Sequence, residues 1–144
     1  ATMREYLVNV NERLLSLNQL AHTYMQSRND TYVMELAIQY IRRNYPKPIT
    51  LAMVSNEVSL NYAYFSTMFS KYTGKTFSEY LRNTRMEKAK ELLRQPDISI
   101  AEVAAQVGYE NYKSFYRAFK DAVGTTPVEY QQKKYRIHRE DEKQ

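Results

Sequence analysis

Apolar residues near the start of the chain recur at alternating intervals of four and three positions. They lie at Met3, Leu7, Val10, Leu14, Leu17, Ala21 and Tyr24. This spacing places them on one face of an α-helix, and it matches the seam of a coiled coil over about three heptads. Two interpretations are open. The helix packs on its own domain, or it pairs with a second copy of the chain to form a homodimer through residues 3–24.

A polar break follows at Arg28, Asn29 and Asp30, and aspartate is a residue type suited to the N-cap of a helix. Helical spacing then resumes until Pro46, which stops a helix because proline has no backbone N–H to donate. The apolar positions of this stretch are Tyr32, Val33, Leu36, Ala37, Tyr40 and Ile41. We therefore expect a linker helix over residues 1–30 and a compact domain that begins at residue 31.

The rest of the chain carries the start and stop signals of further helices. N-cap residue types stand at Thr50, Asn61, Thr76, Ser99, Asn111 and Thr126, and glycines suited to a helix end stand at Gly74, Gly108 and Gly124. Three of these caps have a glutamate three positions later, as in a capping box. The long helix that opens at Thr76 ends before Pro96. With only 3 Gly and 4 Pro in the chain, these signals predict an all-α fold.

The chain resembles itself at an offset of 50 residues. This offset pairs Phe65 with Phe115, Phe69 with Phe119, Gly74 with Gly124, Thr76 with Thr126, Glu79 with Glu129 and Tyr80 with Tyr130. Upstream the offset becomes 49, where Thr50 meets Ser99 and Val58 meets Val107, so the second copy has one extra residue in its turn. The repeat predicts two helix-turn-helix subdomains joined by a long helix.

In each subdomain the second helix has an apolar stripe and a polar face. Phe65, Met68, Phe69 and Tyr72 are expected to face inward, as are Phe115, Ala118, Phe119 and Ala122. The outward positions are then Ala63, Ser66, Thr67 and Ser70 in the first copy, and Lys113, Tyr116, Arg117 and Lys120 in the second. Such faces fit a DNA major groove, but small polar and basic residues are also ordinary on an exposed helix. The duplication favours the groove-binding interpretation.

Composition and charge narrow the classes of protein to which the chain could belong. The formal net charge of +5 suggests an anionic partner, and residues 51–95 hold seven Lys or Arg against four Glu. No cysteine is present, which excludes disulfides, cysteine-bound zinc and thiol catalysis. A DNA-cleaving tyrosine recombinase would need a supporting histidine, but His22 lies in the predicted linker and His138 in the predicted tail. We expect no enzyme activity, metal or cofactor, and the lack of a membrane or secretory segment favours the cytoplasm.

Several runs of this sequence are similar to those of a known family. They are FSKYTGKTFSEYL (69–81), RMEKAKELL (85–93), IAEVA (100–104), and FYRAFK with GTTPVEY between residues 115 and 130. On these runs residues 31–135 resemble the DNA-binding domain of the AraC/XylS family of bacterial transcription regulators. The resemblance implies seven helices and a sequence-specific regulator of transcription. Its two recognition helices would enter successive major-groove segments of double-stranded DNA, about 34 Å apart.

The resemblance also implies which residues touch DNA. Base contacts map onto Ala63, Ser66, Thr67, Lys113, Tyr116 and Arg117, the positions that the polar faces also give. Phosphate contacts map onto Asn61, Tyr64, Lys71, Asn111, Tyr112 and Lys120. The first unit offers no long bidentate donor, so Arg117 is the residue expected to recognise guanine. Ser55 and Tyr109 depart from the usual Ala and Phe of the family.

The resemblance extends to partners. The seam before Asp30 looks like the linker helix of AraC-type response regulators in two-component systems, so we expect the chain to be a fragment without its sensor or receiver domain. Residues 136–144 are charged and expected to fray. A contact of the coiled coil with RNA polymerase is a further expectation, which rests on the helix and not on the resemblance. The competing function is a helical protein-interaction module that acts through the coiled coil, and insensitivity of binding to salt would favour it.

Overall fold

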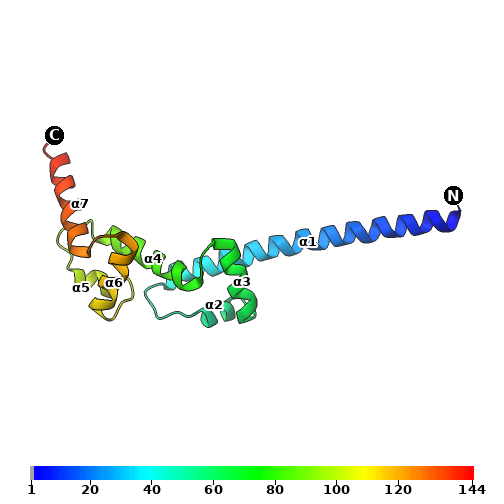
Figure 1. Cartoon of the computed structure of the whole chain (residues 1–144), viewed down its shortest axis with the longest axis horizontal. Coiled ribbons are helices and arrows are strands. Elements are labelled where there is room, and N and C mark those ends of the chain that lie inside the picture. Colours follow the sequence, from blue (N-terminus) through cyan, green and yellow to red (C-terminus); the bar gives the residue numbers. More distant parts are fainter. Residues whose placement is uncertain (1) are drawn as a thin grey trace. The chain divides into compact units, whose positions relative to one another are not determined.

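The computed structural model describes residues 2–144, apart from the side chains of residues 24–27. These residues form helices and no strand, so the predicted all-α class is confirmed. In chain order the seven helices are α1 (Met3–Asn44), α2 (Leu51–Glu57), α3 (Tyr62–Thr73), α4 (Phe77–Leu92), α5 (Ile100–Gln106), α6 (Tyr112–Val123) and α7 (Pro127–Asp141) (Figure 1).

The first helix differs from its prediction. Contacts divide the chain into two compact parts, Ala1–Leu36 and Ala37–Gln144, and α1 contributes to both. The helix is continuous through residues 28–30, so the expected break and the Asp30 N-cap are wrong. Asn and Asp cost a helix only about 0.7 kcal/mol each, and neither Gly nor Pro interrupts this stretch. The predicted seam member Tyr24 lies outside the described side chains, and the domain boundary at residue 30 stays a prediction.

Helices α2 and α3 form the first helix-turn-helix unit. Thr50 caps α2 and Asn61 caps α3, as their residue types predict. In the turn, the Leu60 N–H donates to the Ser55 carbonyl at 2.9 Å, and Ser59 adopts a φ of 58°. That left-handed conformation costs a non-glycine residue about 1–2 kcal/mol, so the hydrogen-bonded turn holds Ser59 in it.

The buried Ser55 satisfies its own hydroxyl. Its side chain is buried, and its Oγ donates to the Ala52 carbonyl at 2.9 Å. A buried hydroxyl is costly only when it lacks a partner. This bond within the same turn explains why a serine is tolerated there.

Helices α5 and α6 repeat the same turn with one more residue, as the change of offset predicted. The Tyr109 N–H donates to the Ala104 carbonyl at 2.9 Å, and Gly108 takes the left-handed position with a φ of 99°. Residues 107–111 separate these helices, whereas residues 58–61 separate α2 and α3. Both bonds of the capping box are formed at Ser99 and Glu102 before α5.

Helix α4 joins the two units and contributes to the core of each. Helices α3, α5 and α6 all pack on it. In the first unit, the ring of Phe69 lies 6.2 Å from that of Phe77 and 5.3 Å from that of Tyr80, the latter edge-on. The core of the second unit consists of Met86, Ala89, Leu93, Val103, Ala104, Val107, Phe115 and Phe119. A shared helix of this kind joins the two units through packed side chains and not through a flexible linker.

Two positions predicted to be buried are exposed. Tyr72 is 41% exposed and Ala122 is exposed, while Met68 and Ala118 are half-buried. The phenylalanines at 65, 69, 115 and 119 are fully buried. The middle turns of α3 and α6 therefore pack on the core, and the last turn of each helix extends beyond the core to the glycine at its end.

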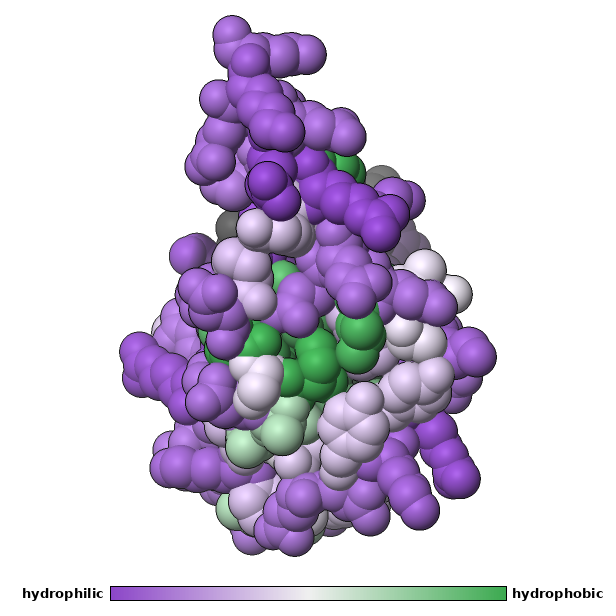
Figure 2. Space-filling model, turned by 90° about the vertical axis from the view of Figure 1, so that its left-hand side faces the viewer, coloured by the Kyte–Doolittle hydropathy of each residue, from purple (hydrophilic) through white to green (hydrophobic). Residues whose placement is uncertain are grey.

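Helix α7 extends further than the sequence predicted. Thr126 and Glu129 form both bonds of a capping box with Pro127 in the first turn, and the helix continues to Asp141. The expectation that residues 136–144 fray is thus wrong for most of the tail. An exposed pair, His138 and Glu142, lies at 3.2 Å across the last turn. Figure 2 views the side that carries α5, α6 and α7, where a compact hydrophobic area stands among hydrophilic residues.

Candidate nucleic-acid interface

The outer face of α3 is built of small side chains. Asn61 Oδ1 accepts hydrogen bonds from the N–H groups of Ala63 and Tyr64, which fixes the first turn. Ala63 and Thr67 are exposed and Ser66 is half-buried. The Thr67 hydroxyl donates back to the Ala63 carbonyl at 3.2 Å. With its hydroxyl engaged inside the helix, Thr67 offers its methyl group, which suits contact with a thymine methyl better than a polar base edge.

The outer face of α6 is cationic and larger. Asn111 Oδ1 caps the helix by accepting from the Lys113 N–H at 2.8 Å. Lys113 and Arg117 are exposed. Tyr116 is half-buried, and its ring lies 6.2 Å from that of Tyr112. A guanidinium at Arg117 can form two parallel hydrogen bonds to the major-groove edge of guanine, as the sequence predicted for this position.

The same positions are exposed in both helices. From residue 61 to 69 and from residue 111 to 119, the order of exposed, half-buried and buried residues is identical. Ser66 thus matches Tyr116, and Thr67 matches Arg117. The two outward faces inferred from the repeat are therefore equivalent surfaces of equivalent helices.

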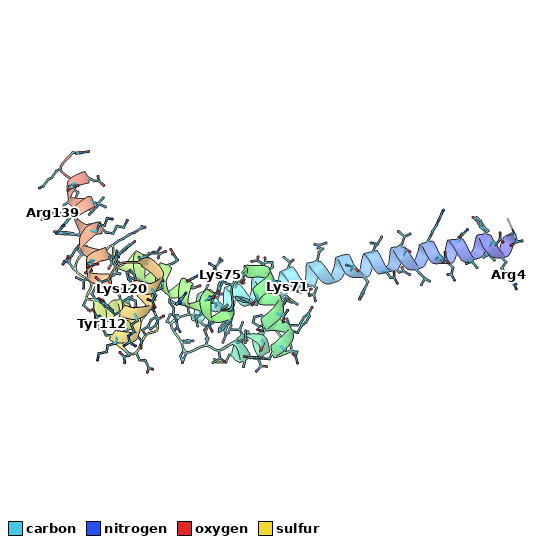
Figure 3. All side chains as sticks on the ribbon, in the orientation of Figure 1. Arg4, Lys71, Lys75, Tyr112, Lys120 and Arg139 are labelled. Carbon is cyan, nitrogen blue, oxygen red and sulfur yellow. The ribbon has the colours of Figure 1, made fainter. Side chains whose placement is uncertain are left out.

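The six predicted phosphate contacts fall into two groups along these helices. Asn61 and Asn111 are the N-caps, and the exposed Tyr64 and Tyr112 lie in the first turns. The two lysines, 71 and 120, lie in the last turns instead. Figure 3 labels Tyr112 and Lys120 at opposite ends of α6, and Lys71 with Lys75 around the end of α3. A DNA backbone that touched both groups would have to run along the helix and not only cross its N-terminus.

A hollow next to α3 is lined by two residues, Tyr62 and Arg82, that the sequence analysis did not assign to the interface. It has a volume of about 610 Å³, and Tyr62, Ser66, Thr76 and Arg82 are among the residues that line it. Tyr62 is the first residue of α3 and is 56% exposed, and Arg82 is an exposed cation on α4. The sequence marks Arg82 as a helix residue, but only the packing of α4 on α3 brings it beside the recognition helix.

Not every basic residue of the 51–95 stretch is available to a partner. Lys88 donates to Glu91 at 3.0 Å, a bond that raises the pKa of the lysine, and Lys90 lies 2.7 Å from Glu87. Both pairs lie along α4. The basic residues of this stretch outside these pairs are Lys71, Lys75, Arg82, Arg85 and Arg94. Of these five, Lys71 and Lys75 lie around the end of α3, Arg82 and Arg85 lie on α4, and Arg94 lies just beyond its end.

Arg85 is engaged inside the protein. Its Nε donates to the Tyr45 carbonyl at 2.8 Å and its Nη2 to the Lys47 carbonyl at 2.9 Å. Its guanidinium also lies 5.5 Å from the centre of the Tyr109 ring. Burial raises the pKa of the Tyr109 phenol above its usual value of 10.0, while the charge of Arg85 acts in the opposite direction. Tyr109 therefore stays neutral at physiological pH and introduces no pH dependence into this region.

Among the described residues, no three acidic or histidine side chains converge as ligands of a metal ion would. No helix in the described part of the chain is long and apolar enough to cross a membrane.

Comparison with known proteins agrees with this arrangement. Residues 54–133 match a family described as a helix-turn-helix domain. The C-terminal domain of AraT, a response regulator from Geobacillus stearothermophilus, is 34% identical with a TM-score of 0.68, and the match covers 70% of this chain and 84% of that one. The C-terminal domain of the two-component response regulator yesN from Fusobacterium nucleatum is 38% identical with a TM-score of 0.64, covering 67% and 95%.

A curated relative of similar length also matches. The transposon Tn10 TetD protein of Escherichia coli is 30% identical over 117 residues, which are 81% of this chain and 85% of that protein. By contrast, the chain spans only 13% to 36% of the length of four other curated relatives that it matches. The chain belongs to the AraC/XylS family of helix-turn-helix transcription regulators.

Proposed function

We propose that residues 31–135 read a bipartite DNA site, with α3 in one major-groove segment and α6 in the next. The observation that carries this proposal is the identical pattern of exposure along the two helices, which presents equivalent faces from one packed body. Base contacts are assigned to Ala63, Ser66, Thr67, Lys113, Tyr116 and Arg117. This activity would be exercised in the cytoplasm, where bacterial DNA lies.

Phosphate contacts would position the two helices without reading sequence. We assign them to Asn61, Tyr64, Lys71, Asn111, Tyr112 and Lys120. Their place at the helix N-termini supports this assignment, because the positive end of the helix dipole favours a phosphate there even though the cap already accepts the N–H groups of Ala63, Tyr64 and Lys113. Each asparagine uses Oδ1 for its cap. Its Nδ2 group is the part of the side chain suited to donate to a phosphate.

Selection of bound sequences from a random pool of duplexes tests the proposal. We expect a motif of two short blocks about one helical turn apart, with centres separated by 10–10.5 base pairs. Titration of the selected duplex at two salt concentrations should give weaker binding at the higher one, because bound phosphates release counterions. Recovery of no motif by the folded chain, or binding indifferent to salt, would contradict the proposal and favour a module that binds protein.

A charge-matched control separates base reading from attraction between opposite charges. Arg117→Ala removes a cation from the outer face of α6, and Arg139→Ala removes one from α7, where its guanidinium lies 5.7 Å from the Tyr135 ring. We expect only the first variant to change the selected motif. Equal losses for both variants on selected and random DNA would show that Arg117 contributes charge alone.

We also propose that the apolar seam of α1 pairs two copies of the chain. Within residues 2–23 the seam residues Leu7, Leu14 and Leu17 are 59%, 54% and 62% exposed. A seam with heptad spacing and this exposure fits a second copy of the same helix, because each apolar side chain then meets its own counterpart. Pairing would bring two DNA-binding domains together and raise affinity through effective concentration.

Two neighbouring leucines provide a matched test of pairing. Leu14 lies on the seam and Leu15 lies off it, and they are similarly exposed at 54% and 58%. Leu14→Glu would place like charges against each other in a dimer, so we expect it to give monomers in sedimentation equilibrium. Leu15→Glu should leave the mass unchanged. A wild-type chain that is monomeric throughout the micromolar range would contradict the proposal.

A contact of the coiled coil with RNA polymerase remains a prediction. In vitro transcription from a promoter that carries the selected site would test it. We expect the chain to change the amount of transcript, and Arg117→Ala to remove that change by removing the protein from its site. Occupancy of the site without any effect on transcription would contradict a polymerase contact by this chain.

A further inference from the structure

Three segments that are far apart in the sequence meet between the two helix-turn-helix units. They are the loop of residues 45–47 that leads into α2, the middle of α4, and the turn between α5 and α6. In this junction Arg85 and Gly108 contact the loop of residues 45–47, and Tyr109 lies beside Arg85. We propose that the junction fixes the separation of α3 and α6 and so selects the spacing of the two DNA blocks. The inference rests on the bipartite binding proposed above and names the residues that set its geometry.

Arg85 ties the loop to α4. Its two hydrogen bonds, of 2.8 and 2.9 Å, end on the carbonyls of Tyr45 and Lys47, one on each side of Pro46. A planar guanidinium that holds two backbone oxygens fixes orientation as well as distance, which a lysine ammonium does not. Ile49 is buried and Thr50 caps α2 immediately afterwards, so the position of this loop sets where the first unit begins.

Gly108 brings the turn of the second unit against the same loop. A Cβ added at Gly108 would lie 2.8 Å from the Pro46 carbonyl oxygen and 3.1 Å from its Cα. Only glycine allows this approach, because any Cβ would collide with Pro46. The φ of 99° at this position is a second reason, because it disfavours residues other than glycine. Tyr45 packs against the core of the second unit, and Tyr109 lies under the Arg85 guanidinium at 5.5 Å.

The corresponding turn of the first unit is not built this way. At the offset of 49 residues, Ser59 stands where Gly108 does, and Leu60 stands where Tyr109 does. Ser59 keeps a left-handed φ of 58° while carrying a side chain. A side chain is therefore tolerated at a φ of 58°, whereas the wider φ of 99° and the close approach to Pro46 both favour glycine at position 108. This asymmetry indicates that the close contact serves the joining of the two units.

Spacing of the DNA blocks is the property that the junction would control. Inserting one base pair between the blocks moves the second by about 3.4 Å and rotates it by about 35°. Two readers held rigidly cannot both follow that change, so the gain from simultaneous engagement is lost. A more flexible junction would let α6 move with the DNA block that it binds, so both blocks could stay bound.

The experiment measures the affinity of the full chain for the selected site and for duplexes with one base pair added or removed between the blocks. Gly108→Ala is the test variant. Gly124→Ala is its control, because Gly124 also has a left-handed φ, of 89°, but a Cβ there would meet nothing within 4 Å. For the wild type and Gly124→Ala we expect each spacing change to weaken binding by about tenfold or more. For Gly108→Ala the loss should shrink to about threefold, with weaker binding at the best spacing.

Arg85→Lys provides a second variant, which keeps the positive charge but removes the planar guanidinium that bonds two carbonyls. It also tests the inference if Gly108→Ala fails to fold. We expect the same flattening of the spacing profile, with unchanged affinity for a duplex that carries one block. An unaltered profile in folded Arg85→Lys would overturn the inference, whatever its overall affinity. If the wild type itself shows no spacing preference or selects a single block, the bipartite function fails and not merely the role of the junction.

Discussion

The first helix-turn-helix unit presents Ala63, Ser66 and Thr67 where the second presents Lys113, Tyr116 and Arg117, although the order of burial around these positions is the same in both. The phenylalanines behind the two faces are also retained at the same offset. A packed core tolerates little change in volume, whereas an outward face is free to follow its ligand. The two copies of this scaffold therefore share their interior and differ where they would meet DNA.

The largest effects should come from what the two units share. Phe69→Ala and Phe119→Ala remove equivalent, fully buried rings, and each should lower the free energy of unfolding by about 3–5 kcal/mol. Because α4 contributes to both cores, we expect one cooperative transition in urea for either variant, measured by circular dichroism. Two separate transitions, of which only one moves, would show that the units fold independently.

The next effect should distinguish the two faces. Arg117→Ala should weaken discrimination at one base position by about 1–3 kcal/mol. Its counterpart Thr67→Ala removes one methyl group and a hydroxyl that is bonded inside the helix, so we expect about 0.8 kcal/mol. Competition binding with single-base variants of each block measures both. A larger loss for Thr67→Ala would reverse the assignment of the stronger reader to α6.

A smaller effect should distinguish the two turns. Ser59→Gly relieves a left-handed conformation that costs about 1–2 kcal/mol, but the added glycine gives back about 0.5–1 kcal/mol through the entropy of the unfolded chain. We expect a net gain in stability of about 0–1.5 kcal/mol. The opposite exchange, Gly108→Ser, should destabilise, because its Cβ would meet the Pro46 carbonyl. Thermal unfolding of the two variants should therefore shift in opposite directions, and a shift in the same direction would refute this account of the turns.

The smallest effect concerns charge at the far ends of the recognition helices. At the offset of 50 residues, Lys71 of the first unit stands where Asp121 does in the second. Lys71→Ala should weaken all DNA sites alike and reduce the salt dependence of binding by about one counterion. Asp121→Ala should strengthen binding slightly and without sequence preference. A change in the selected motif in either variant would show that this end of the helix touches bases.

Local signals in the sequence predicted much of this fold. The caps at Thr50, Asn61, Ser99 and Thr126 are formed, because a side-chain oxygen satisfies N–H groups only a few residues away. The change of offset from 50 to 49 correctly predicted one extra residue in the second turn. The continuity of α1 was missed because polar residues alone do not end a helix.

Hydrogen bonds and periodicity over a few residues specify the two helix-turn-helix units, their helix ends and the faces that look outward, so these features could be predicted from the sequence. The tertiary structure alone decided that Arg82 lies beside α3, that Arg85 holds the carbonyls of Tyr45 and Lys47, and that Gly108 lies against Pro46. The contacts of Arg85 and Gly108 join residues about 40 to 60 positions apart, and Arg82 lies 16 and 20 positions from Ser66 and Tyr62. No local pattern in the sequence marks these contacts. They depend on how the helices pack once they have formed, and this packing sets the separation of the recognition helices α3 and α6.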